Sequence, residues 1–233
     1  PDATVEIAES AGVGATVPGT ASLATDPDAG DRLQYELVKQ EPDRPIFRVL
    51  AADGSVEVKS ALLDFETVPV HRVWVRVTDI DGLADEGVIT IEVQDVNEPP
   101  TLLAQARAVD ENAPGAPVGE PLIASDPDAA DKGALTFSLL SGGAATQFAI
   151  NSTSGQLSTA AGSALDHESA GLIVLSVQVE DTQGLTSTAQ VSVTVRDVNE
   201  APSMAEDTFE FKVAENAVMG TQIDFVRAAD VAD

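Results

Sequence analysis

Carboxylate side chains recur through this chain in a fixed pattern. A Leu-Asp-x-Glu motif at residues 63–66 returns at 165–168, and an Asp-Val-Asn-Glu motif at 95–98 returns at 197–200, each time 102 residues later. An Asp-Pro-Asp motif at 26–28 returns 100 residues later, at 126–128. Two single acidic positions also repeat, Glu9 as Glu111 and Glu215, and Asp79 as Asp181.

Clustered carboxylates of this kind suit a hard cation. Calcium takes about six to eight oxygen ligands from carboxylates, amides and backbone carbonyls. The chain has no cysteine, and His167 stands where the first repeat has Phe65, so the pattern supplies no repeated soft ligand. The sequence therefore predicts calcium binding. Taken singly, the Asp-Pro-Asp motifs could instead form Asx turns, which need no metal.

The length of the repeat indicates domains in series. A period of about 100 residues is too long for a solenoid, whose repeats run at roughly 20–50 residues, and suits a self-sufficient domain. We expect a first domain at 1–100, a second at 101–202 and the truncated start of a third at 203–233. Prolines at the boundaries predict short, stiff connectors. The chain reads as a piece of a longer protein.

Composition excludes several kinds of partner. The chain has 39 acidic against 12 basic residues, for a formal charge of −27. A field of this sign repels nucleic acid and disfavours an anionic membrane surface. The hydrophobic share of 43% fits a folded chain rather than a disordered acidic tail. There is no run of about 18 apolar residues, so we expect no membrane insertion by this segment. Without cysteine, disulfides cannot stabilise the fold.

Apolar residues alternate with polar ones in several segments. Val73, Val75 and Val77 alternate with Arg72, Trp74 and Arg76, and the alternation recurs at 89–93, 175–179 and 191–195. Turn signals separate such segments at 53–54, 81–82, 154–155 and 183–184. Period-two alternation is typical of half-buried antiparallel strands. The sequence predicts an all-β fold of tandem Greek-key, immunoglobulin-like β-sandwiches.

The five acidic motifs, in this order over two repeats, resemble tandem cadherin repeats of the bacterial cadherin-like branch, in secreted or surface adhesin-type proteins. The resemblance implies three calcium ions between successive domains, with the base of each site in one domain and its top in the next. At the first junction it implies as ligands Glu9, Asp64, Glu66, Asn97, Glu98, Asp126, Asp128 and Asp181, with backbone carbonyls of Val96 and Pro99 and one near Gly133. At the second junction the resemblance implies as ligands Glu111, Asp166, Glu168, Asn199, Glu200 and Asp230. In the first domain, Asp26, Asp28 and Asp79 match the top half of a site whose base would belong to a preceding domain.

The linkers depart from the family pattern, which reads Asp-x-Asn-Asp-Asn. Glu98 and Glu200 replace the second Asp, and Pro99 or Ala201 replaces the following Asn. The replaced Asn would contribute only a carbonyl, so the ligand set is retained. The longer Glu and the earlier Pro leave the angle between the domains and the number of ions open.

Two further residues could carry other functions. Trp74, the only tryptophan, is expected on an outward strand face between two arginines, where it could stack on a sugar. His71 aligns with Ile173 and is expected to be a strand-end residue with satisfied hydrogen bonds. No nucleophile lies in a recognisable catalytic context, so we predict that the chain is not an enzyme.

These residues predict a calcium-binding rod segment of a large extracellular or cell-surface protein that supports adhesion. Its partners would be calcium and, beyond it, other proteins or surface polysaccharide. Two alternatives remain open: a carbohydrate-binding module that uses Trp74, and a non-catalytic appendage of a secreted enzyme.

Overall fold

The computed structural model describes residues 2–28, 32–204, 210–223 and 228–229. The chain divides into two compact units, Pro1–Glu98 (unit 1) and Pro99–Asp233 (unit 2). Each unit has a hydrophobic core of its own. Asp230 lies outside the described residues, as do residues 29–31. The predicted domain limits at residues 100 and 202 stay predictions.

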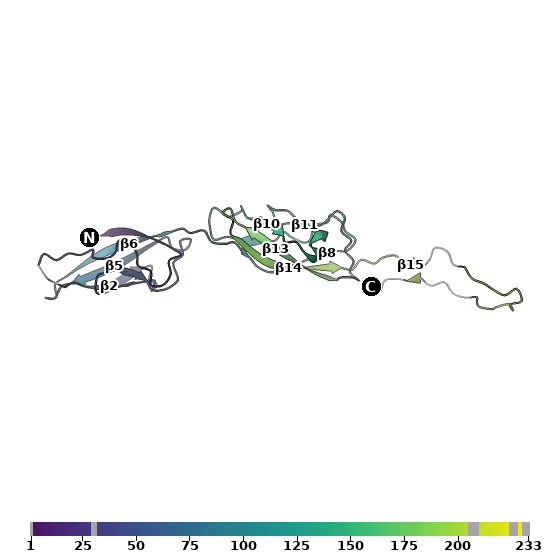
Figure 1. Ribbon diagram of the computed structural model, residues 1–233, viewed down its shortest axis with the longest axis horizontal. Coiled ribbons are helices and arrows are strands. Elements are labelled where there is room, and N and C mark those ends of the chain that lie inside the picture. The colour runs from purple at the N-terminus through teal and green to yellow at the C-terminus, as the bar shows by residue number, and fades with distance from the viewer. Residues whose placement is uncertain (1, 29–31, 205–209, 224–227, 230–233) are drawn as a thin grey trace. The chain divides into compact units, whose positions relative to one another are not determined.

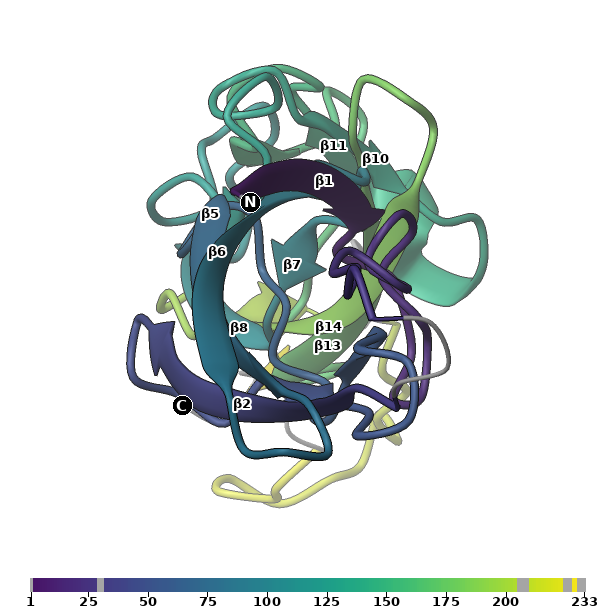
Figure 2. The ribbon, with the colours of Figure 1, turned by 90° about the vertical axis from the view of Figure 1, so that its left-hand side faces the viewer.

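Unit 1 is built from a four-stranded sheet and a two-stranded sheet. The larger sheet has the strand order β1-β6-β5-β2 and is curved, with β1 and β2 at its edges (Figure 2). The smaller one pairs β3 with β4. The strands of unit 1 are β1 Ala3–Ala8, β2 Gln34–Glu41, β3 Phe47–Val49, β4 Val56–Val58, β5 Val70–Thr78 and β6 Ala84–Gln94.

Unit 2 repeats this arrangement, with the sheet order β10-β13-β14-β8 and a β11-β12 pair (Figure 1). A further short pair, β7 with β9, ends next to Asp126. The elements of unit 2 are β7 Thr101–Leu102, β8 Gln105–Asp110, β9 Ala124–Ser125, β10 Thr136–Leu139, the 3-10 helix η1 Gly143–Gln147, β11 Phe148–Ile150, β12 Leu157–Thr159, β13 Leu172–Glu180, β14 Thr186–Arg196, β15 Ser203–Met204 and β16 Ala228–Ala229. Strands β15 and β16 pair with each other, within the residues predicted to begin a third domain.

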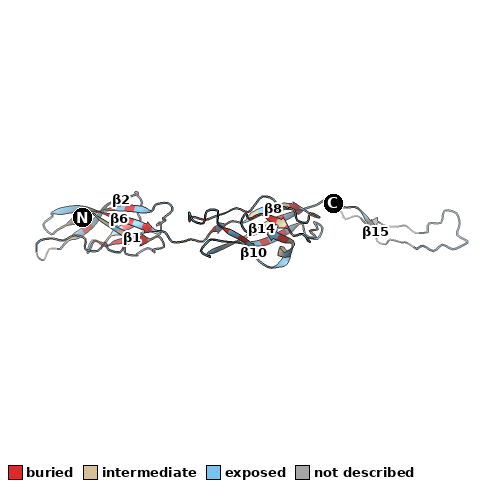
Figure 3. Ribbon diagram, turned by 90° about the horizontal axis from the view of Figure 1, so that it is seen from above, coloured by how far each residue is buried: buried red, intermediate tan, exposed pale blue. Residues whose placement is uncertain are grey.

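The all-β prediction is confirmed, and the predicted alternation lies where the sequence placed it. Val73 and Ile91 are fully buried in unit 1, as Val177 and Val193 are in unit 2, whereas Val75 and Val77 of β5 are half-buried. Buried and exposed positions are interspersed along the strands of both units (Figure 3). The predicted turn glycines, among them Gly54 and Gly155, have positive φ, a conformation that glycine adopts without steric cost. Among the described residues, no helix is long and apolar enough to cross a membrane.

One strand pairing in each unit is parallel, a feature that the sequence did not predict. The hairpins β5–β6 and β13–β14 are antiparallel as expected, but β1 runs parallel to β6, and β8 runs parallel to β14. Alternation reports only which side chains face the core, so it cannot give the direction of the neighbouring strand. The parallel pairing matters because it brings the end of β1 beside the end of β6, where the acidic linker begins.

Candidate metal centre

Glu9 joins two acidic loops of unit 1. It directly follows β1, and its two carboxylate oxygens accept different backbone amides: Phe65 N–H at 2.8 Å and Val96 N–H at 2.8 Å. These amides belong to the Leu-Asp-Phe-Glu motif and to the linker after β6. One carboxylate oxygen from each of Glu9, Asp64 and Glu66 lies within 4.8 Å of the others. We call these three residues the unit 1 base.

Unit 2 builds the same connection with Glu111. Its carboxylate accepts His167 N–H at 2.7 Å and Val198 N–H at 2.8 Å, each 102 residues after the equivalent donor in unit 1. These two hydrogen bonds lower the pKa of Glu111. Glu9 and Glu111 therefore each connect an acidic loop to the following linker through hydrogen bonds from backbone amides.

The acidic groups gathered around Glu111 differ in part from the predicted set. Carboxylate oxygens of Glu111, Glu168, Asp197 and Glu200, the unit 2 base, lie within 4.8 Å of one another. Burial and the charge of Glu111 raise the pKa of Glu200, although Asn112 Nδ2 donates to it at 2.6 Å.

The predicted ligands Asp64 and Asp166 both bind their own loops. Asp64 accepts Thr67 N–H and Thr67 Oγ1–H, each at 2.8 Å. Asp166 accepts the corresponding groups of Ser169, at 3.2 and 2.7 Å, and these bonds lower its pKa. The two aspartates thus have a structural role in addition to the ligand role that the sequence predicts. In the linkers, the side-chain Nδ2 groups of Asn97 and Asn199 donate to the backbone carbonyls of Glu98 and Glu200, at 3.4 and 3.1 Å.

The predicted top of the first site is a buried acidic cluster in unit 2. Asp126, Asp128 and Asp181 are 7%, 4% and 6% exposed. Asp126 accepts Asp128 N–H at 2.9 Å, and Asp181 accepts the amides of Gln183 and Leu185, each at 2.8 Å. These are the Asx turns of the simpler interpretation, and in Asp126 the turn uses only Oδ1. The second oxygen of Asp126, Oδ2, is buried and has no hydrogen-bond partner.

Asp131 is a fourth buried acid that the sequence interpretation missed. It is fully buried, and carboxylate oxygens of Asp126, Asp128 and Asp131, the top cluster, lie within 4.8 Å of one another. Burial raises the pKa of Asp126. The charges of the other acids in this loop raise it further, although the amide of Asp128 lowers it. The spacing Asp-Pro-Asp-x-x-Asp also occurs in the first repeat with Asp31, and this recurrence was the available signal. For Asp197, likewise, the available signal was that Asp95 stands at the equivalent position of the first repeat.

The corresponding loop of unit 1 has the same turns but is more open. Asp26 accepts Asp28 N–H at 2.8 Å, and Asp79 accepts Asp81 N–H at 2.8 Å and Leu83 N–H at 2.9 Å. Asp28 is exposed and Asp26 is half-buried. These aspartates can therefore be solvated by water in this structure.

The residues present fit calcium. The donors are carboxylate and amide oxygens and backbone carbonyls, the ligand types that calcium prefers. A buried carboxylate oxygen without a partner is costly unless a cation or a donor approaches it. The top cluster has two such oxygens, on Asp126 and Asp131, so its chemistry favours a bound cation.

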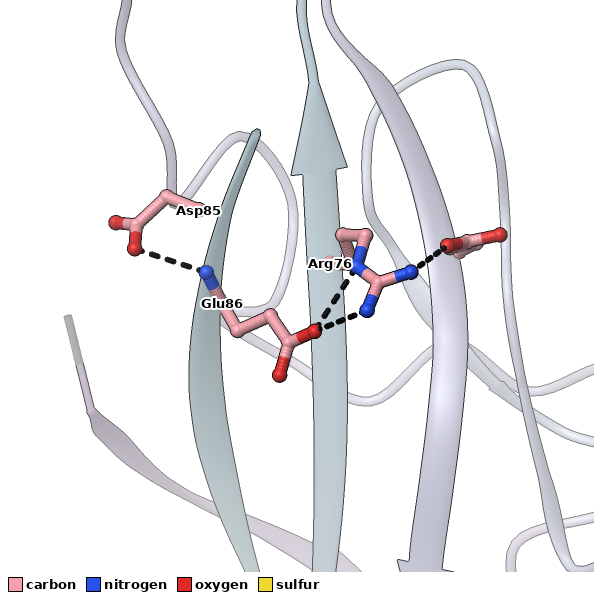
Figure 4. A network of polar contacts seen from close by, with 4 residues as sticks. Arg76, Asp85 and Glu86 are labelled. Carbon is pink, nitrogen blue, oxygen red and sulfur yellow. Dashed lines mark hydrogen bonds and ion pairs between the residues drawn. The ribbon is translucent and has the colours of Figure 1, made fainter. Parts of the chain in front are cut away.

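Trp74 lies on an outer sheet face among paired charges. Lys39 Nζ lies 3.8 Å from the centre of the Trp74 ring, a cation–π contact between neighbouring strands. Beside it, Arg76 bridges Glu86 on β6 and Glu36 on β2, and the amide of Glu86 donates to Asp85 (Figure 4). The predicted outward position of Trp74 is confirmed, and Lys39 covers one face of its ring.

His71 differs from its prediction. It is 2% exposed and packs edge-on against Phe47 with ring centroids 5.4 Å apart. Its Nε2 is buried without a hydrogen-bond partner, so the expectation of a satisfied residue is wrong. The position belongs to the core face of β5, where the second repeat has Ile173, and strand alternation offers it no polar neighbour.

Comparison with known proteins gives a consistent likeness. Residues 105–196, within unit 2, match the family model of the Cadherin domain. Chicken Cadherin-1 is 33% identical over 242 residues, which cover 91% of this chain and 27% of that protein. Mouse Cadherin-related family member 2 is 29% identical over 212 residues, covering 86% of this chain and 16% of that protein.

Solved structures agree with the fold. The structure of mouse Cadherin-23 EC22-24 matches with a TM-score of 0.66 and 26% identity, covering 98% of this chain and 74% of that one. Human CDH23 EC21-23 matches at a TM-score of 0.63 and 24% identity, over 99% of this chain and 83% of that one. The Greek-key β-sandwich prediction is thereby confirmed. The chain spans only 27% of the length of Cadherin-1 and 16% of that of the mouse relative.

Proposed function

We propose that this chain is a calcium-binding, cadherin-like segment of a large extracellular or cell-surface protein, in which bound calcium limits the movement between successive domains and so supports adhesion. The observation that carries the proposal is the top cluster, where Asp126 and its neighbours are buried and Oδ2 of Asp126 lacks a partner. Burial of several carboxylates in one loop is unfavourable without a compensating cation.

The chain's own residues would hold the metal in two parts. The unit 1 base and the linker residues Asn97 and Glu98 would supply one part, and Asp126, Asp128 and Asp181 the other. The sharing of ions between them rests on the family resemblance and on the order of the motifs along the chain. Bound calcium supplies the positive charge that lets these carboxylates stay ionised close together.

Glu9 has a distinct role in this scheme. Because it fixes both the 63–66 loop and the linker through their amides, Asp64, Glu66 and the linker are positioned before any ion arrives. Such preorganisation reduces the conformational entropy lost on binding. Glu111 provides the same preorganisation for the second predicted junction, with Asp166, Glu168, Asn199, Glu200 and Asp230 as its proposed ligands.

Calcium concentration would act as the switch. Extracellular calcium modules bind at about 10⁻⁴–10⁻³ M, so millimolar calcium outside a cell would fill these sites. Without calcium, repulsion among the acidic groups would leave the linker free to bend. With calcium, the shared ligands would hold it and raise stability by mass action.

The cadherin names of the relatives support the adhesive and extracellular parts of this proposal and the absence of catalysis. The chicken and mouse relatives are animal proteins, and the bacterial origin predicted from the resemblance stays a prediction. For the carbohydrate-binding alternative, Lys39 Nζ lies over one face of the Trp74 ring and would compete with a sugar for that face. The enzyme-appendage alternative concerns sequence beyond these residues.

A calcium titration of matched variants tests the proposal. Asp126→Asn keeps the acceptor for the amide of Asp128 but removes the charge, whereas Asp26→Asn makes the same change in the open loop of unit 1. By isothermal calorimetry, Asp126→Asn should weaken calcium binding by at least about tenfold, equal to roughly 1.4 kcal/mol. Asp26→Asn should change it little. Equal isotherms for the two variants, or no calcium binding by the wild type, would contradict the proposal.

A further inference from the structure

Asp131 is the buried acid that the proposed ligand set does not use. We propose that its Oδ2 is a direct calcium ligand, so that Asp126, Asp128 and Asp131 of unit 2 together contact one ion. This inference rests on the proposed function and adds a residue to its site.

The position of Asp131 is fixed from several sides. Its Oδ1 accepts Thr182 N–H at 2.7 Å, which ties the loop before β10 to the turn that follows Asp181. Its own amide donates to the carbonyl of Asp128 at 3.2 Å, and its carbonyl accepts Ala134 N–H at 3.0 Å. The side chain therefore has one orientation set by backbone contacts, as a preorganised ligand requires.

The remaining oxygen of this side chain has no partner. Asp131 is 0% exposed, and its Oδ2 is buried without a hydrogen bond, as is Oδ2 of Asp126. The three aspartates of the top cluster bring one carboxylate oxygen each within 4.8 Å of the others. Two unpartnered, buried carboxylate oxygens in one small cluster are energetically unfavourable unless a cation or another donor approaches them.

The chemistry of the cluster selects a hard divalent cation. Three carboxylates supply only anionic oxygen, which suits calcium better than a soft transition metal. A buffer anion is repelled by the same charges. A bound water could donate hydrogen bonds to the oxygens, but it would not offset the repulsion among three carboxylates.

The first repeat has the same residue at the same place. Asp31 precedes Asp131 by 100 residues, the offset that also relates Asp26 to Asp126 and Asp28 to Asp128. Asp31 lies outside the described residues, so the recurrence is one of sequence. This recurrence indicates that Asp131 belongs to an extended Asp-Pro-Asp-x-x-Asp motif that both repeats share.

A purely structural role is the competing explanation. In that case Asp131 serves only to hold the turn at Thr182 through Oδ1. The two roles use different oxygens, and Asp131→Asn separates them. Asparagine keeps an oxygen that can accept Thr182 N–H, but it loses the charge and replaces the other oxygen with a donor.

The experiment uses the whole 233-residue chain with Asp131→Asn, and with Asp43→Asn as a control that removes one exposed charge from unit 1. Calcium is titrated by calorimetry, and melting is followed in chelator. The ligand role predicts at least about tenfold weaker binding, or one ion fewer, for Asp131→Asn alone. Its melting temperature in chelator should equal or exceed that of the wild type, since an unpaired buried charge is removed.

The opposite results overturn the inference. If Asp131→Asn binds calcium as the wild type does, Asp131 is not a ligand, and the proposed function stands. If its melting temperature in chelator also falls, the role is structural. If the wild type binds no calcium, both proposals fail.

A second measurement needs no variant and so does not depend on its folding. The carboxyl carbon of Asp131 in the wild-type chain should shift in the NMR spectrum as calcium is added, with the same saturation as that of Asp126. A carboxyl signal of Asp131 that stays in place while that of Asp126 moves would overturn the inference.

Discussion

Glu9→Gln should loosen unit 1 in the absence of calcium. Glu9 accepts one backbone amide with each carboxylate oxygen, from Phe65 and Val96, both at 2.8 Å. Glutamine has nearly the same shape but only one accepting oxygen. The side-chain NH2 group of glutamine would face the backbone N–H of either Phe65 or Val96. Because both groups are donors, that hydrogen bond is lost.

The size of the effect follows from these two bonds. A hydrogen bond to a charged group contributes about 1.5–3 kcal/mol, and a neutral one about 0.5–1.5 kcal/mol. The variant exchanges two bonds to a carboxylate for one neutral bond, a gross loss of about 2–5 kcal/mol. Removal of one charge from the unit 1 base relieves repulsion with Asp64 and Glu66 and offsets about 1–2 kcal/mol of this loss. We expect a net destabilisation of about 1–3 kcal/mol.

The assay is urea denaturation in chelator, followed by tryptophan fluorescence. Trp74 is the only tryptophan and lies in β5, so its signal reports on unit 1. With an m-value of about 2 kcal/mol per M, the midpoint should fall by about 0.5–1.5 M. Glu111→Gln removes the equivalent bonds in unit 2 and is the matched control. It should leave the Trp74 midpoint in place while it lowers the stability seen by circular dichroism.

Two results would contradict the proposed role of Glu9. An unchanged Trp74 midpoint for Glu9→Gln would mean that the two amide contacts do not hold the loops of unit 1. An equal shift of that midpoint by Glu111→Gln would mean that the effect comes from charge in general.

Two further predictions concern the cores. Burial, and to a lesser degree the charge of Arg44, lower the pKa of His71, so the folded state binds its proton less readily than the unfolded state, whose pKa is about 6.5. The free energy of unfolding of unit 1 should therefore fall as the pH drops below about 7 and level off below the lowered pKa. His71→Ile should remove this fall, as measured by Trp74 fluorescence during unfolding in chelator. Equal pH slopes for the variant and the wild type would contradict this prediction. Gly155→Ala should destabilise unit 2 more than Gly133→Ala, as read from melting in chelator. Both glycines have positive φ, and alanine in this conformation costs about 1–2 kcal/mol at either position. Only at Gly155 would the new Cβ also contact other atoms, namely Leu122 O at 3.1 Å and the Phe137 ring at 3.2 Å. Equal melting temperatures of the two variants would contradict this.

Strand positions were predictable because alternation directly reports burial. Val73 and Val177 are buried where the period of two placed them, and glycines with positive φ mark the predicted turns. The direction of β1 was not predictable in this way, since parallel and antiparallel neighbours bury the same side chains. The missing partner of His71 is likewise a property of what packs around a strand and not of its own sequence.

The candidate site was predictable in its acidic motifs but not in how they connect. The repeat located Glu9 and Glu111, yet their bonds to two separate loops depend on the parallel pairing that brings the ends of β1 and β6 together. Asp131 recurs from Asp31, but its importance comes from its burial and its unpartnered oxygen, which spacing alone cannot reveal. The ligand assignments themselves, with Asp230 outside the described residues, stay proposals.

The central claim is that calcium restrains the connection between successive domains. Small-angle X-ray scattering of the wild-type chain tests it most directly, in millimolar calcium and in chelator at matched ionic strength, with magnesium to control for charge screening. Calcium, and not magnesium, should narrow the distribution of interatomic distances and raise the largest dimension, because bent conformations are lost. Scattering curves that superimpose with calcium and with chelator would contradict it.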